Sequence, residues 1–178
     1  MEKTRYVYLG TAVPKANACR YAPFDNGLPK PITPPDDDGK IIKNVEEIDG
    51  YSMIINKNYF KNNIFFDEKF FMYLENVDLC LRAKKDTGKL LIIMNSKIHH
   101  LGAQAVDDKY IEEVELSRNW HWMWSKFYFN KKHRGFFVST LIGFISLLGN
   151  FLKYTIYMIT FNKKRNIYRM RMSGIINS

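Results

Sequence analysis

Cysteine is almost absent from this sequence, since the 178 residues contain two, Cys19 and Cys80. Two thiols cannot cross-link a chain of this length, so a disulfide scaffold is excluded. A lysine-rich chain with two lone thiols is instead typical of a reducing compartment. The first residues are charged and no apolar stretch follows them, so we expect no secretory signal peptide.

Acidic residues are missing from the last third of the chain. No Asp or Glu occurs between Leu116 and Ser178, whereas that segment holds eleven Lys and Arg residues. The net charge of +9 therefore arises in this segment, because residues 1–115 sum to −2. Such a division indicates an anionic partner, either a membrane surface or nucleic acid.

Proline is absent after residue 35, and all six prolines lie within residues 14–35. We therefore expect residues 1–45 to form loops and short edge strands with little helix. The acidic run Asp36–Asp38 follows a proline pair and precedes Gly39, which favours a solvated turn over a metal site. Disorder of the whole chain is excluded, because 46% of the residues are hydrophobic and 15% are aromatic.

One long apolar segment is present, from Gly135 to Phe161, and Lys153 is its single charge. Its length meets the threshold for a transmembrane helix. Basic residues flank both ends, which favours a re-entrant hairpin or in-plane helices, broken at Gly149-Asn150, over a single span. The alternative is a buried helical hairpin in a soluble core or an oligomer interface.

We therefore assign residues 134–178 to a membrane-associating helical tail that binds an anionic bilayer peripherally or monotopically. The side chains expected to contact the membrane are aromatic or basic and lie at the two ends of the apolar segment. They are Trp120, Trp124, Lys131, Lys132, Arg134, Phe136, Phe137, Lys163, Lys164 and Arg165.

Alternating helix and strand patterns begin after residue 46 and predict an α/β layer. Strands are predicted over 51–56 and 89–94 because both runs are apolar. Helices are predicted over 57–62, 75–85 and 107–130, the second ending before Gly88 and the third before Lys131.

Glu75, Asp78 and Arg82 fall on one face of the second predicted helix, with the two carboxylates in its first turn. One interpretation is structural, with Glu75 capping the helix and Asp78 pairing with Arg82. The other is chemical: the aromatic run before the helix raises the basicity of a carboxylate, which then acts as a general base. His99 and His100 follow the next strand, at the edge where α/β sheets place ligand-binding groups, although a histidine pair in itself more often has a structural role.

In this order and spacing, residues 46–102 resemble the acceptor-side half of family 2 glycosyltransferases, particularly the bacterial rhamnosyltransferase-like branch. That family has a glycine before a Met-containing apolar run, a Phe-Asp-Glu-x-Phe-Phe motif, an acidic motif ending in Asp-Leu-x-x-Arg, and then Gly, a strand and a histidine. The matching residues are Gly50, Met53, Phe66, Asp67, Glu68, Phe70, Phe71, Glu75, Asp78, Leu79, Arg82, Gly88 and His99. A looser likeness continues through residues 117–133.

The resemblance implies a GT-A type α/β fold over residues 46–133 and inverting transfer of a sugar from a nucleotide-diphospho-sugar to a glycan or lipid-linked acceptor. In this family a divalent metal, Mn²⁺ or Mg²⁺, holds the diphosphate leaving group. Carried onto this chain, Glu75 and Asp78 belong to the catalytic acidic motif. His99 and His100 lie where the metal or diphosphate is approached, and Asp49, Gly50, Asn76 and Arg82 lie near the substrate.

Two departures from the family pattern stand out. Asn76 occupies the place of the acid commonly assigned as the base, and an amide cannot accept a proton at neutral pH. The nucleotide-binding half with its Asp-x-Asp motif does not precede residue 46, so we expect an incomplete fragment of such an enzyme. The alternatives are a non-catalytic membrane- or partner-docking module and, more weakly, a single-stranded nucleic-acid binder that stacks bases on the tryptophans of residues 120–124.

Overall fold

The computed structural model describes residues 6–11, 42–48, 50, 52–55, 65–85, 88–97 and 106–178. The chain divides into two compact units. The first unit comprises residues 1–67 and 75–105, and the second comprises residues 68–74 and 106–178. The second predicted domain boundary, at residue 133, therefore falls inside a unit, between two of its helices.

The first unit contains a three-stranded sheet in the order β1-β3-β2. β1 (Tyr6–Thr11) pairs in parallel with β3 (Lys89–Lys97), and β2 (Ile42–Asn44) pairs with β3 antiparallel. The predicted strand over 89–94 is confirmed and continues for three more residues. Its run Leu90, Leu91 and Ile92 is buried, as expected for a central strand covered on both faces.

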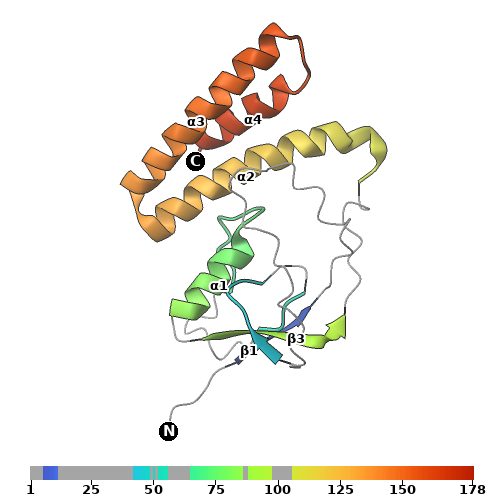
Figure 1. Ribbon diagram of the computed structural model, residues 1–178, viewed down its shortest axis with the longest axis vertical. Coiled ribbons are helices and arrows are strands. Elements are labelled where there is room, and N and C mark those ends of the chain that lie inside the picture. The colour runs from blue at the N-terminus through green and yellow to red at the C-terminus, as the bar shows by residue number, and fades with distance from the viewer. Residues whose placement is uncertain are drawn as a thin grey trace. The chain divides into compact units, whose positions relative to one another are not determined.

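Helix α1 (Glu75–Lys85) has the predicted bounds and packs against β3 (Figure 1). Leu79, Cys80 and Ala83 of α1 form an apolar core with Ile48 and Leu90. Each of these side chains is less than 5% exposed. The Gly88 amide then donates to the Ala83 carbonyl at 2.8 Å, which closes the end of the helix.

The strand predicted over residues 51–56 is wrong for the described residues 52–55, which form no ladder. Met53 and Ile55 pack against the core of α1 and β3, while Ile54 is 61% exposed. The alternation of apolar side chains is therefore satisfied by a loop that lies on the core, without strand pairing. The helix predicted over 57–62 lies outside the described residues, as does the acidic turn at Asp36–Asp38.

The second unit is a bundle of three helices. A short 3-10 helix, η3 (Asp108–Tyr110), precedes α2 (Ile111–Arg134), so the helix predicted from residue 107 begins four residues later and extends past residue 130. Asp107 accepts from the Lys109 amide at 3.2 Å, which explains the delay, because the first turn is capped as a 3-10 turn. α3 (Phe136–Ile159) and α4 (Arg165–Ile176) follow, and each of the three helices packs against the other two (Figure 1).

The break predicted at Gly149-Asn150 is wrong, because α3 runs without interruption through both residues. The Asn150 side chain donates to the Ser146 carbonyl at 2.7 Å, and so it binds the helix backbone of the preceding turn. The chain reverses only after α3, near Phe161, whose φ of 51° is left-handed. The apolar segment therefore forms one long helix, not two short ones.

Candidate functional site

The first residue of α1 carries a carboxylate oxygen without a partner. Glu75 Oε2 is buried and makes no hydrogen bond within the described part of the chain. A Cβ built on Gly50 would lie 3.7 Å from Glu75 Oε1 and 3.5 Å from the Asn76 Cβ. The structure thus brings together Gly50, Glu75 and Asn76, three residues that the sequence placed near the substrate or the catalytic base.

Asn76 has a structural partner. Its side-chain amide donates to the Ile48 carbonyl at 2.7 Å, which ties the first turn of α1 to the chain before Gly50. This bond requires an N–H donor, which a carboxylate at the same position does not offer. Asn76 therefore has a local structural role in this protein.

The backbone immediately before α1 is strained. Tyr73 and Leu74 have φ values of 70° and 66°, although neither is glycine. The left-handed conformation costs about 1–2 kcal/mol for such residues, so two in succession persist only when packing compensates. Leu74 is 8% exposed, and its burial supplies part of that compensation. Strain of this kind clusters at functional sites, and here it immediately precedes Glu75.

Asp78 forms an ion pair with Arg82, one turn further along α1. Its side chain is fully buried and its Oδ2 lies 2.9 Å from Arg82 Nε. Arg82 also donates through Nη2 to the Phe65 carbonyl, so the pair ties α1 to the chain preceding Asp67. The pairing proposed from the i, i+4 spacing is present, and a fully buried carboxylate so engaged has no access to a substrate hydroxyl.

The remaining predicted site residues lie outside the described residues. They are Asp49, expected near the substrate, and His99 and His100, expected near the metal or diphosphate. Within the described ranges, no three His, Cys, Asp or Glu side chains gather as a metal-binding group. Glu75 Oε2 offers one oxygen, whereas Mg²⁺ and Mn²⁺ require several oxygen ligands. The described residues by themselves therefore supply too few ligands for the metal that the resemblance implies.

The second unit presents an apolar surface that belongs to α3. Its outward side chains include Phe137 at 88% exposed and Ile159 at 76%, and Phe161 just beyond the helix is 86% exposed. α3 is long and apolar enough to cross a membrane, with a mean hydropathy of 1.6 over its most apolar window and only 17% of that window buried. Exposed apolar surface on this scale marks an interaction site.

The inward face of α3 is small and polar. Ser139, Gly143 and Asn150 are its buried residues, and they repeat at the helical spacing. The sequence interpretation missed this stripe, although its i, i+4, i+11 spacing was available. Stripes of small residues that allow helices to pack closely are typical of helices in membranes.

The predicted membrane-contacting residues divide into two groups. The first group is exposed and lies at the end of α2 and at the two ends of α3. Its members are Lys131, Lys132, Arg134, Phe136, Phe137, Lys163 and Lys164, and Arg165 nearby is half-buried. The indole N–H groups of Trp120 and Trp124 instead donate within the unit, at 3.1 Å, to Ser173 Oγ and the Asn177 carbonyl. These two tryptophans therefore hold the end of α4 against α2.

His121 on α2 lies among aromatic rings. Its ring centroid is 4.8 Å from that of Phe71 and 4.9 Å from that of Trp120. Burial among these rings lowers the pKa of His121 from its usual value, because desolvation disfavours the charged imidazolium. The imidazole is therefore neutral at pH 7.

Comparisons with protein-family models, with curated proteins and with solved structures found no match to this chain. The likeness to family 2 glycosyltransferases therefore rests on the residue pattern alone.

Proposed function

We propose that this chain is the acceptor-side part of an inverting, family 2-like glycosyltransferase with a GT-A type α/β fold, and that Glu75 is its general base. The observation that supports this assignment is the buried Glu75 Oε2 without a hydrogen-bond partner in the described chain. A carboxylate oxygen that accepts no hydrogen bond from the described chain can accept one from the hydroxyl of an acceptor. Such a group suits proton abstraction from an acceptor hydroxyl.

The reaction is a single displacement. The acceptor oxygen attacks the anomeric carbon of the donor sugar while Glu75 removes the hydroxyl proton, and the nucleoside diphosphate leaves with the electrons of the broken C–O bond. Glu75 is positioned for this by its place at the start of α1, where Gly50 leaves the neighbouring surface without a side chain. Asp78 and Arg82 hold the helix and do not contact the substrate.

Transfer of labelled sugar tests this assignment. Membranes containing the full chain, alone and together with a separately expressed donor-binding half, are given radiolabelled dTDP-rhamnose, UDP-glucose or UDP-galactose with Mn²⁺. Label should enter the lipid or polysaccharide fraction, and Glu75→Gln should lower the rate at least 100-fold by removing the base. The matched control is Glu113→Gln, an exposed carboxylate on α2 outside the family motif, which should retain the rate. Transfer that survives Glu75→Gln would rule out this base, and no transfer under any condition would rule out the transferase.

A second candidate function is membrane docking without catalysis, and the exposed apolar face of α3 favours it. Membrane attachment itself is compatible with either function. The cytoplasmic leaflet of the plasma membrane is the proposed location, because it is anionic and attracts the basic residues at both ends of α3.

The packing of the bundle favours an in-plane α3. With 24 residues α3 is about 36 Å long, enough to cross a hydrocarbon core of about 30 Å. However, α2 and α4 pack against it and carry charged residues, among them Lys126 of α2 and Arg169 of α4. Charged groups at the bilayer centre cost several kcal/mol each. We therefore propose that only the outward face of α3 enters the lipid, with α2 and α4 on the aqueous side.

Depth-dependent fluorescence quenching distinguishes the two orientations. Single cysteines at Phe137, Leu148 and Phe161 in a cysteine-free background are labelled and quenched by lipids that are spin-labelled at known depths. An in-plane helix gives three similar shallow depths, whereas a spanning helix places the label at residue 148 deepest. Absence of binding to anionic vesicles would refute the attachment itself.

A further inference from the structure

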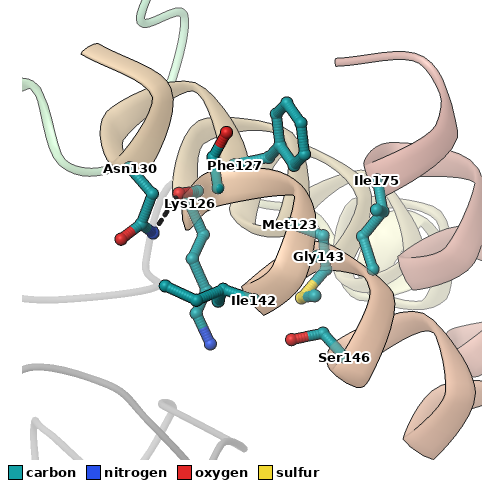
Figure 2. Close-up of a pocket in the computed structure, with 9 residues that line it drawn as sticks. Met123, Lys126, Phe127, Asn130, Ile142, Gly143, Ser146 and Ile175 are labelled. Carbon is teal, nitrogen blue, oxygen red and sulfur yellow. Dashed lines mark hydrogen bonds between the residues drawn. The ribbon is translucent and has the colours of Figure 1, made fainter. Parts of the chain in front are cut away.

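The hollow between α2 and α3 is too small for an organic ligand. Figure 2 shows the side chains that line it, among them Asn130 of α2 and Ser146 of α3. The space between them holds about one water molecule. Asn130 also donates its side-chain amide to the Lys126 carbonyl of its own helix at 2.7 Å (Figure 2). A ligand larger than water is therefore excluded from this part of the unit.

An exposed aromatic ring lies on the outer surface of the same unit. Phe71, in the segment before α1, is 75% exposed. Its ring centroid is 4.8 Å from that of His121 on α2, with an angle of 34° between the two planes. Removal of a phenylalanine ring from water is favourable, so Phe71 gains free energy from any ligand that covers it.

The segment that carries Phe71 is held against α2 on both sides of this residue. Phe70 is 6% exposed and meets the Tyr128 ring edge-on, with the centroids 4.9 Å apart. The Met72 carbonyl accepts a hydrogen bond from Ser125 Oγ at 2.7 Å, and Ser125 is fully buried. Because both of its neighbours are fixed, Phe71 cannot turn inward without breaking these contacts. The ring is therefore preorganised for a ligand.

His121 adds hydrogen-bonding groups beside the Phe71 ring. Because partial burial lowers its pKa, the imidazole is neutral at pH 7 and has one N–H donor and one nitrogen acceptor. Neither nitrogen makes a hydrogen bond with the residues that the structure describes. The Trp120 ring packs edge-on against the imidazole at 4.9 Å and supports it. His121 can therefore both donate to and accept from the hydroxyl groups of a ligand.

We propose that Phe71 and His121 bind a sugar unit of the acceptor, with the Phe71 ring on the C–H face of a pyranose and the His121 imidazole hydrogen-bonded to one of its hydroxyls. A pyranose has C–H groups on its faces and hydroxyls around its rim, which matches an exposed ring beside a neutral imidazole. Its identification as the acceptor rests on the transferase proposed above. The chain keeps Phe71 near Glu75, because four residues extend over about 14 Å at most.

Saturation-transfer NMR of the full chain in detergent tests the site with the methyl glycosides of rhamnose, glucose and galactose. At least one glycoside should receive saturation, most strongly at its ring C–H protons. Phe71→Ala should weaken its binding about tenfold through loss of the stacked ring, and Phe71→Trp should retain it. His121→Phe keeps a ring but removes both nitrogens, and should weaken binding about threefold. The matched control Phe137→Ala removes an exposed phenylalanine of α3 and should change binding less than about twofold.

The outcomes separate the sugar site from the transferase. Saturation of no glycoside, or equal binding by the native chain and Phe71→Ala, would overturn the site, and the Glu75→Gln comparison would still decide the transferase. Binding that depends on Phe71, in a chain that transfers no sugar, would support the site and refute only the transferase. Vesicle flotation that is lost in Phe71→Ala, with glycoside binding unchanged, would show that the ring contacts lipid and would overturn the site.

Discussion

The interiors of the two units differ in how many polar side chains they bury. Around α1 the interior is apolar except for the ion-paired Asp78, with Leu79, Cys80 and Leu90 no more than 3% exposed. In the three-helix unit the most completely buried side chains are polar, namely Asn119, Ser125 and Ser139. A polar interior combined with an exposed apolar face is the reverse of the arrangement that water favours, and it is the pattern expected where a helix packs through small and polar residues and turns its apolar face toward a partner.

The polar interior of the three-helix unit is hydrogen-bonded. Ser125 donates to the Met72 carbonyl at 2.7 Å, Asn119 donates to the Glu115 carbonyl at 2.8 Å, and Arg171 donates to Asn119. Satisfied polar groups stabilise a bundle, while unsatisfied ones cost about 1–3 kcal/mol each. The most deeply buried polar groups of the unit are thus satisfied within it, whereas the outward face of α3 is apolar and exposed.

The largest loss of stability is expected from breaking the buried ion pair of Asp78 and Arg82. It distinguishes Asp78 from Glu75, the other carboxylate at the start of α1. Asp78→Ala should lower the free energy of unfolding by about 3–5 kcal/mol, because Arg82 is left with an uncompensated charge. Glu75→Gln should not destabilise the protein, since Oε2 has no donor to lose in the described structure. Urea unfolding of both variants measures the difference, and equal losses would contradict it.

Two leucines compare the units directly. Leu79 is 3% exposed in the first unit, so Leu79→Ala should cost about 3 kcal/mol of unfolding free energy through lost burial and a cavity. Leu148 is 52% exposed on α3, so Leu148→Ala should cost less than about 0.5 kcal/mol. Leu148→Ala should instead weaken vesicle binding, which Leu79→Ala should leave unchanged. A large stability loss at residue 148 would mean that α3 is covered by protein.

Two glycines test how closely the helices of the bundle approach. A Cβ on Gly174 would overlap the Trp120 carbonyl oxygen and lie 3.3 Å from the Met123 Cβ, so Gly174→Ala should cost about 2 kcal/mol. Gly149 has open space around its Cβ position, so Gly149→Ala should stabilise the helix by about 0.5–1 kcal/mol. Thermal unfolding in detergent should show a lower melting temperature for Gly174→Ala and a higher one for Gly149→Ala. An unchanged melting temperature for Gly174→Ala would show that α2 and α4 separate easily.

The smallest effect concerns the charge inside the bundle. Because the pKa of Lys126 is lower in the folded chain than its usual 10.5, the unfolded chain binds more protons between the two values. Stability should therefore rise with pH through that window, and Lys126→Met should be more stable than the native chain below it. The advantage of Lys126→Met should disappear as the pH exceeds 10.5. A constant difference in melting temperature across this range would contradict the assignment.

Local sequence signals were sufficient for the regular elements. The bounds of α1 follow from its apolar spacing and from Gly88 beyond its end, and β3 follows from its run of leucine and isoleucine. The i, i+4 spacing also indicated the pair between Asp78 and Arg82. These features depend on neighbours within one or two turns, which a sequence displays directly.

Features that depend on distant partners were not predictable in this way. The alternation at residues 52–55 resembles a strand, but the packing of Met53 and Ile55 on another element decided their conformation. Two helix-weakening residues at positions 149–150 suggested a break. In the structure α3 is continuous there, and it packs against both α2 and α4. The unpartnered oxygen of Glu75 likewise depends on the arrangement of several segments, which spacing alone does not give.

The junction between α2 and α3 consists of one residue, Gly135, with a φ of 90° and a ψ of 164°. This conformation is accessible essentially to glycine alone. The φ and ψ angles of Gly135 therefore set the direction of α3 relative to α2. A surface that binds the phenylalanine-rich side of α3 consequently also fixes the orientation of α2 relative to that surface.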